Sequence, residues 1–210
     1  MPVIVSVFHA HRKRYGARRI AQELHYRGYE CGRERVTKLM KSRGLKAIQP
    51  KSFKPRSTES RHSLGYSPNL ILDLAEPARI NELWVGDITY IPVASNGFCY
   101  LSILMDRFSR RILGWALGED MTESLVTDSL KKAISTRQPP PDVIHHTDRG
   151  GQYAATRYRA ILRRASMRQS MSRAGDCYDN AFMESCFGTI KVELEMNEYQ
   201  TYRLALKDIA

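Results

Sequence analysis

Three acidic residues in the second half of the chain have the types and positions that metal-assisted chemistry requires. Asp87 lies inside an otherwise apolar strand pattern, Asp148 directly follows a second such pattern, and Glu184 lies in the first turns of the last helical pattern. Singly, each has an ordinary structural explanation, but an unpaired carboxylate among the apolar neighbours of Asp87 is costly unless a cation lies beside it. Two Mg²⁺ or Mn²⁺ ions about 4 Å apart can activate an attacking oxygen and stabilise a leaving oxygen at a phosphodiester. The sequence therefore predicts two Mg²⁺ or Mn²⁺ ions held by Asp87, Asp148 and Glu184.

The elements that must position these acids form a pattern typical of an α/β domain with a mixed sheet. The strand-like runs are residues 84–93, 98–105, 111–117, 143–147 and 167–171, and the helical runs are 122–137, 153–165 and 180–195. Short turns separate the first three strands, which we therefore expect to form an antiparallel meander. Alternating helices and strands follow, as in domains whose helices cover a sheet that is partly parallel.

The excess positive charge is confined to the first third of the chain. Of the formal net charge of +11, residues 1–65 contribute +12, from sixteen Lys and Arg residues against four glutamates. This asymmetry favours a polyanionic partner, above all nucleic acid. Two short helical patterns between Gly16 and Lys46 are separated by a turn that contains Gly28 and Gly32. A helix-turn-helix that binds double-stranded DNA is the predicted arrangement.

The second of these helices should bury its apolar residues and leave its polar side chains outward. The outward residues are the candidate DNA contacts: Arg35, Thr37, Lys38 and Lys41. A helical hairpin with a merely solvated basic face is the alternative. We expect a helix-turn-helix region at 1–48, a flexible basic linker at 49–80, which begins rich in Lys, Ser, Pro and Arg, and a catalytic core at 81–210.

Three sequence blocks carry a family resemblance. Residues 84–90 (WVGDITY), 146–153 (HTDRGGQY) and 172–185 (SRAGDCYDNAFMES) resemble the signature blocks of integrase-like transposases of bacterial insertion sequences. The chain is most similar to the second-reading-frame product of two-frame elements, a relative of retroviral integrases. The resemblance implies a ribonuclease-H-like fold and metal-dependent DNA cleavage and strand transfer. It also implies that Asp87, Asp148 and Glu184 form a DDE triad, and 35 residues separate the last two, as the family pattern requires.

A basic residue seven positions after the glutamate also belongs to the family pattern, and Lys191 supplies it. Seven residues are close to two helical turns, so Glu184 and Lys191 share a helix face and the ammonium group could reach DNA bound at the metals. Lys191 is therefore a candidate catalytic and DNA-binding residue. A surface lysine paired with Glu195 is the alternative.

The resemblance spans about residues 16–210 and has further implications. The expected partners are element ends and target DNA, further copies of this chain on DNA, and an upstream-frame DNA-binding protein or fusion. The chain stops soon after residues 199–201, where the family continues, so we expect a C-terminally truncated core. Residues 1–8 lack the family's longer helical start and are compatible with a strand or with the remnant of an alternative start. Two rival functions stay open: an inactive fragment that binds element ends as a regulator, and a plain ribonuclease-H-like nuclease.

Other polar residues are expected to have structural roles. These are Asp106, pairing locally with Arg107; His145 and His146, in the core or hydrogen-bonded; Asp179 or Asn180, capping the last helix; and Gly150 with Gly151, allowing a tight turn. The four cysteines form no CxxC pair or zinc-finger spacing. The chain has no signal peptide and no apolar stretch of the roughly 20 residues that a membrane span needs. It is therefore predicted to be a soluble, cytoplasmic, nucleoid-associated bacterial protein.

Overall fold

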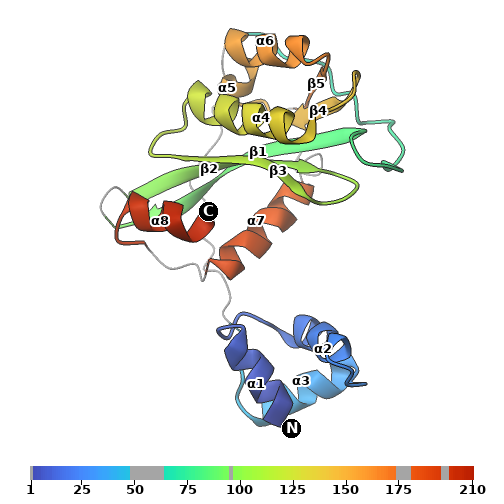
Figure 1. Cartoon of the computed structure of the whole chain (residues 1–210), viewed down its shortest axis with the longest axis vertical. Coiled ribbons are helices and arrows are strands. Elements are labelled where there is room, and N and C mark those ends of the chain that lie inside the picture. The colour runs from blue at the N-terminus through green and yellow to red at the C-terminus, as the bar shows by residue number, and fades with distance from the viewer. Residues whose placement is uncertain (1, 48–63, 95–96, 174–180, 195–198) are drawn as a thin grey trace. The chain divides into compact units, whose positions relative to one another are not determined.

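The computed structural model describes residues 2–47, 64–94, 97–173, 181–194 and 199–210 (Figure 1). The chain divides into two compact units. One comprises Met1–Ser52 with Gly188–Met196, and the other comprises Phe53–Phe187 with Asn197–Ala210. We call them the N-terminal unit and, because it contains most of the predicted catalytic core, the catalytic unit. Helix α7 (Ala181–Glu193) contributes its first half to the catalytic unit and its last turns to the N-terminal unit.

The N-terminal unit is built on α1 (Pro2–Ala10), α2 (Ala17–Tyr26) and α3 (Arg33–Ser42). Its apolar core is formed by Ile4, Val7, Phe8, Ile20, Leu24, Val36 and Met40. The two helices predicted between Gly16 and Lys46 are thus confirmed. The strand considered for residues 1–8 is wrong: Pro2 suits a first helical position, and the three buried residues of α1 recur at helical spacing and pack on α2 and α3.

The catalytic unit contains a five-stranded mixed sheet in the order β3-β2-β1-β4-β5. Its strands are β1 (Leu83–Val93), β2 (Gly97–Asp106), β3 (Ile112–Gly118), β4 (Ile144–Thr147) and β5 (Arg168–Met171). β1, β2 and β3 pair antiparallel, as the meander predicted, whereas β4 pairs parallel with both β1 and β5. The predicted α/β class with a mixed sheet is confirmed. Because β4 adds beside β1, the strand that carries Asp87 is the centre of the sheet.

Helices α4 (Glu123–Arg137), α5 (Gly151–Ala154) and α6 (Thr156–Arg164) lie together on one side of the sheet (Figure 1). A single helix was predicted over 153–165, but Ala155 adopts an extended backbone and separates α5 from α6. The core on this face includes Trp84, Leu104, Leu130, Tyr158 and Met171. Gly114 of β3 allows α4 to approach closely, since a Cβ there would lie 2.3 Å from the carbonyl oxygen of Ser129.

Within the predicted linker, the structure describes the chain from residue 64 onward. Residues 64–71 pack along β5. The Ser67 hydroxyl donates to the Gln169 amide oxygen at 2.8 Å, and the Leu70 N–H donates to the Ser170 hydroxyl at 2.9 Å. The Met171 N–H donates to the Pro68 carbonyl at 3.3 Å. This segment therefore covers the outer edge of β5. Residues 49–63 lie outside the described residues.

The C-terminal helix α8 (Tyr202–Ile209) lies on the other side of the sheet from α4 (Figure 1). Tyr199 precedes it and pairs in parallel with Val93 at the end of β1. The Tyr202 hydroxyl donates to the Leu117 carbonyl of β3 at 2.8 Å. Within the described parts of the chain, no helix combines the length and apolar composition needed to cross a bilayer.

Candidate active site

Asp87 lies in β1, and Asp148 directly follows β4, the adjacent parallel strand. β1 and β4 pair up to Val85 opposite His146, and each aspartate follows two residues later in the sequence, Asp87 within β1 and Asp148 directly after the end of β4. Equal offsets along a parallel ladder keep residues side by side and on the same face of the sheet. Both aspartates are half-buried. The topology therefore brings together two carboxylates that are far apart in the sequence.

Local backbone hydrogen bonds orient both carboxylates. Oδ1 of Asp87 accepts from the Ile88 N–H at 2.7 Å, and Oδ1 of Asp148 accepts from the Gly150 N–H at 2.9 Å. Gly150 is the N-cap of α5, and a Cβ there would lie 2.5 Å from the side chain of Gln152. The tight turn predicted after Asp148 is confirmed, and it leads directly into a helix.

The buried hydroxyl of Tyr153 in α5 is affected by the charges of both aspartates. Its hydroxyl is buried and has no hydrogen-bond partner within the described ranges. Burial raises the pKa of Tyr153 well above its usual value, and the negative charges of Asp87 and Asp148 raise it further. Both carboxylates therefore act on the same buried hydroxyl. The Tyr153 ring is fixed by an edge-on contact with Tyr158, at 5.4 Å between ring centroids.

Glu184 lies in the first turn of α7 and is exposed. The flanking Met183 and Phe187 are buried. Across the residues that the structure describes, no group of three or more His, Cys, Asp and Glu side chains is placed to hold a metal ion. Within the described residues, Glu184 therefore does not form a metal-binding group with Asp87 and Asp148. A pair of carboxylates offers only hard oxygen donors, which fits Mg²⁺ or Mn²⁺.

The two histidines before Asp148 have the core roles predicted for them. Nε2 of His145 is 2.6 Å from the Tyr158 hydroxyl. His146 lies between two serines, with Nδ1 2.8 Å from the Ser170 hydroxyl and Nε2 3.3 Å from the Ser172 hydroxyl. Burial, followed by the neighbouring His146, lowers the pKa of His145 to about 3. His145 is therefore a neutral, hydrogen-bonded core residue.

This depressed pKa predicts a loss of stability in mild acid. In the unfolded chain His145 binds a proton near pH 6.5, whereas in the folded unit it stays neutral down to about pH 3. Stability is therefore fully present above pH 6.5 and falls as the pH is lowered. We expect the free energy of unfolding to drop by about 2 kcal/mol between about pH 7 and pH 5 from this group alone.

The measurement is urea unfolding followed by tryptophan fluorescence, because both tryptophans, Trp84 and Trp115, belong to the catalytic unit. The His145→Gln variant lacks the titrating ring and should lose that part of the pH dependence. His146 is also buried, but it is present in both proteins. The difference between their pH dependences of unfolding free energy therefore isolates the contribution of His145. An equal drop in the variant would contradict the prediction.

Asp106 has the structural role predicted for it, with different partners. Its carboxylate accepts hydrogen bonds from the Asn81 N–H and from the N–H and hydroxyl of Ser109, each at 2.7 Å. Arg107, the expected local partner, instead pairs with Glu76 at 2.8 Å. The Asp106 side chain thus holds the β2–β3 turn.

Sequence reasoning missed two features of the catalytic unit. One is the buried Tyr153 hydroxyl, because the helical spacing of Tyr153 indicates only a core position. The other is the Arg107 guanidinium, which lies 3.3 Å from the centroid of the Phe182 ring. These residues are distant in the sequence, so no local pattern indicates their contact. The predicted caps Asp179 and Asn180 lie outside the described residues.

The candidate DNA-binding side chains of α3 are on its surface. Arg35, Thr37, Lys38 and Lys41 are all exposed, while Val36 and Met40 are buried. The Thr37 hydroxyl donates to the Arg33 carbonyl at 2.9 Å, so its donor serves its own helix. This leaves three exposed cationic side chains among the four candidates.

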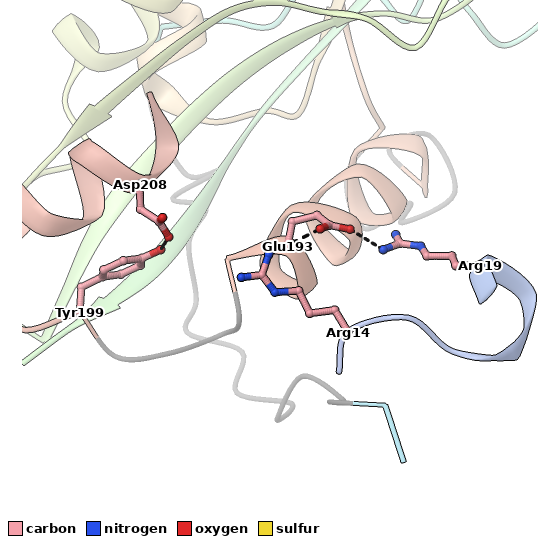
Figure 2. A network of polar contacts seen from close by, with 5 residues as sticks. All are labelled: Arg14, Arg19, Glu193, Tyr199 and Asp208. Carbon is pink, nitrogen blue, oxygen red and sulfur yellow. Dashed lines mark hydrogen bonds and ion pairs between the residues drawn. The ribbon is translucent and has the colours of Figure 1, made fainter. Parts of the chain in front are cut away.

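The last turns of α7 bring Glu193 to the N-terminal unit. Figure 2 shows Glu193 between Arg14 and Arg19, with N–O distances of 3.6 and 2.6 Å. These two arginines are therefore engaged in ion pairs within the protein. Lys191, also in these turns, is half-buried, and burial lowers its pKa. Glu195, its alternative partner, is not among the described residues.

Comparisons with known proteins agree with this architecture. Residues 77–177 match the family described as integrase core domain, and residues 1–53 match the HTH-like domain. The chain is 41% identical to the transposase for insertion sequence element IS904 of Lactococcus lactis, over 91% of this chain and 75% of that protein. It is 39% identical to transposase InsF for insertion sequence IS3A of Escherichia coli K12, over 94% of this chain and 68% of that protein.

Among solved structures, the chain is similar to a chain in the simian T-cell lymphotropic virus intasome in complex with PP2A regulatory subunit B56 gamma. The TM-score is 0.51 at 18% sequence identity, covering 84% of this chain and 59% of that chain. This likeness shows a shared integrase fold. The extent and identity of the match to the bacterial relatives show more: the chain belongs to the IS3-family transposases of insertion sequences, which are polynucleotidyl-transferase enzymes with an integrase core and a helix-turn-helix-like domain.

Proposed function

We propose that this transposase cleaves and joins DNA through a DDE site formed by Asp87, Asp148 and Glu184. The observation that carries the proposal is that Asp87 in β1 and Asp148 directly after β4 follow the parallel pair Val85–His146 at the same offset, and that the charges of both act on the Tyr153 hydroxyl. Two half-buried carboxylates at one place repel each other, so a cation between them is strongly favoured. Glu184, in the first turn of α7, would be the third carboxylate of the site.

The reaction is direct transfer at phosphorus. The oxygen of water, or of a DNA 3′-hydroxyl, forms a bond to phosphorus as the bond to the leaving 3′-oxygen breaks. The proton of the attacking group passes to solvent, and the leaving oxygen takes one up. No covalent intermediate with the protein is needed. The chain's contribution is to hold the carboxylates in a fixed relation, through the strand pairing and the Gly150 turn described above.

Asp87 and Asp148 would hold the divalent metal, Mg²⁺ or Mn²⁺, together with Glu184. When bound, two such ions supply charge neutralisation at the attacking and leaving oxygens. The backbone N–H groups of Ile88 and Gly150 keep one oxygen of each aspartate oriented. Each carboxylate has a second oxygen, and those oxygens would be directed to the metal.

DNA is held by the basic side chains of two regions. Arg35, Lys38 and Lys41 extend from α3 into solvent and would contact the DNA backbone and bases, with Thr37 between them. Lys191 would position DNA from α7. Pairing of two element ends requires more than one copy of the chain, so we propose self-association on DNA. An upstream-frame DNA-binding protein or fusion would add a further contact.

A strand-transfer assay tests the proposal against its two rivals. The full chain is incubated with labelled duplexes carrying the ends of its own element, with and without Mg²⁺. The expected result is Mg²⁺-dependent cleavage at the ends and their joining to target DNA. Cleavage without joining would indicate a plain nuclease, and end binding without either reaction would indicate a non-catalytic regulator.

A further inference from the structure

We infer that Arg107 is a positioning residue for Glu184 and acts through the aromatic ring of Phe182. The inference rests on the proposed function, because it concerns how one member of the triad is held. Phe182 precedes Glu184 by two residues in the first turn of α7. A contact that immobilises the Phe182 ring therefore limits the motion of the glutamate beside it.

The Arg107 side chain lies directly over the face of the ring. The guanidinium carbon is 3.3 Å from the centroid of Phe182, which places the planar cation against the electron-rich face. Only 11% of the Arg107 side chain is exposed, so the contact is partly shielded from water. Both residues belong to the catalytic unit.

The other end of this contact is anchored to the strand that carries Asp87. The Arg107 N–H donates to the Leu83 carbonyl at the start of β1 at 2.9 Å. Asp106, the preceding residue, pairs with Trp84 in the β1–β2 ladder. The guanidinium is further held by Glu76, with Nη2 3.0 and 2.8 Å from its two carboxylate oxygens.

Arg107 thus connects the strand of Asp87 with the helix of Glu184. Phe182 is 37% exposed, so apolar burial alone secures its ring poorly. A planar guanidinium can stack on the ring and bond Glu76 at the same time, whereas a lysine ammonium presents only a point charge. The geometry therefore assigns the first turn of α7 a specific restraint, distinct from the buried contacts of Met183 and Phe187.

The test combines strand transfer with hydrogen exchange of the full chain. In Arg107→Ala, amide exchange over residues 182–187 should quicken by about tenfold, and the joining rate should fall by about tenfold, while DNA affinity is unchanged. Phe182→Leu keeps an apolar side chain but removes the ring, and should reproduce both effects. Adding the second substitution to the first should cause little further loss, because the two residues act as a unit. Arg107→Lys should fall between the wild type and Arg107→Ala.

Lys132→Ala is the matched control. Lys132 also places a cation over an aromatic ring of the catalytic unit, 5.0 Å from the centroid of Trp115, but it lies on α4. It should leave the exchange of 182–187 and the joining rate unchanged. Melting temperatures show that each variant is folded.

Three results would overturn the inference. They are wild-type exchange and joining in Arg107→Ala, faster joining in that variant, or a loss of DNA affinity without a change in exchange, which would make Arg107 a DNA contact. Glu184→Gln separates this failure from that of the proposed function. If Glu184→Gln still joins DNA, the triad itself is wrong. If it does not, but Arg107→Ala and Phe182→Leu join normally, only the positioning role is wrong.

Discussion

We expect Asp87→Asn, Asp148→Asn and Glu184→Gln each to lower the rates of DNA cleavage and joining by more than about a hundredfold. Removing a residue that only hydrogen-bonds to a metal ligand already costs about 10–100-fold in activity, so losing a ligand should cost more. Each change removes one negative oxygen donor and keeps the size of the side chain. DNA affinity should be retained, because the excess basic charge lies in residues 1–65. The measurements are Mg²⁺-dependent strand transfer and, separately, fluorescence anisotropy with end DNA.

Asp128→Asn provides a matched control for these variants. Asp128 is an exposed acid of α4 that pairs with Lys131 at 3.7 Å, so the substitution removes the same charge away from the site. It should leave both measurements at the wild-type level. A triad variant that retained a tenth of wild-type joining, which corresponds to only about 1.4 kcal/mol of barrier, would not be a metal ligand.

The second large effect is expected from neutralising α3. A variant with Arg35, Lys38 and Lys41 all replaced by alanine should lose three phosphate contacts. Each contact contributes about 0.9 to the slope of log affinity against log salt, so the slope should become shallower by about 2.7. By the same relation, binding at about 0.15 M salt should weaken by roughly 100-fold. Val36 and Met40 are untouched, so the N-terminal unit keeps its core.

The measurement is anisotropy of labelled end DNA over about 0.05 to 0.3 M salt, the range in which counterion release dominates. The control variant replaces three exposed arginines of α6, Arg157, Arg163 and Arg164, with alanine and so removes the same charge from the catalytic unit. The α3 variant should lose far more affinity than the control. Equal losses would mean that binding follows net charge and that α3 is not the DNA interface.

The short-range features of this protein were predictable from the sequence. Helical and strand periodicities identified α2 and α3, all five strands and α4, because burial of one face imposes a local repeat. The exceptions also have local causes. α1 was taken for a possible strand because residues 2–8 are an almost continuous apolar run rich in β-branched valine and isoleucine. α5 was merged with α6 because a single extended residue, Ala155, separates them.

The candidate residues of the site came from the sequence, and their arrangement came only from the structure. The sequence alone identified Asp87, Asp148 and Glu184 as candidates, through their positions at strand and helix boundaries and through the three family blocks. It did not determine that β4 adds in parallel beside β1, which is what makes the two aspartates neighbours. Nor did it reveal that, among the described residues, Glu184 does not form a metal-binding group with the two aspartates.

The sequence by itself thus determined element types, the basic first third and the chemical identity of the acids, because each depends on residues close together in the chain. The tertiary structure alone decided the partners: Arg107 with Glu76 and Phe182, and His145 with Tyr158. The physical reason is that partners distant in sequence are selected by which surfaces of completed elements pack together. That choice depends on the complementarity of many side chains at once, and no single local pattern records it.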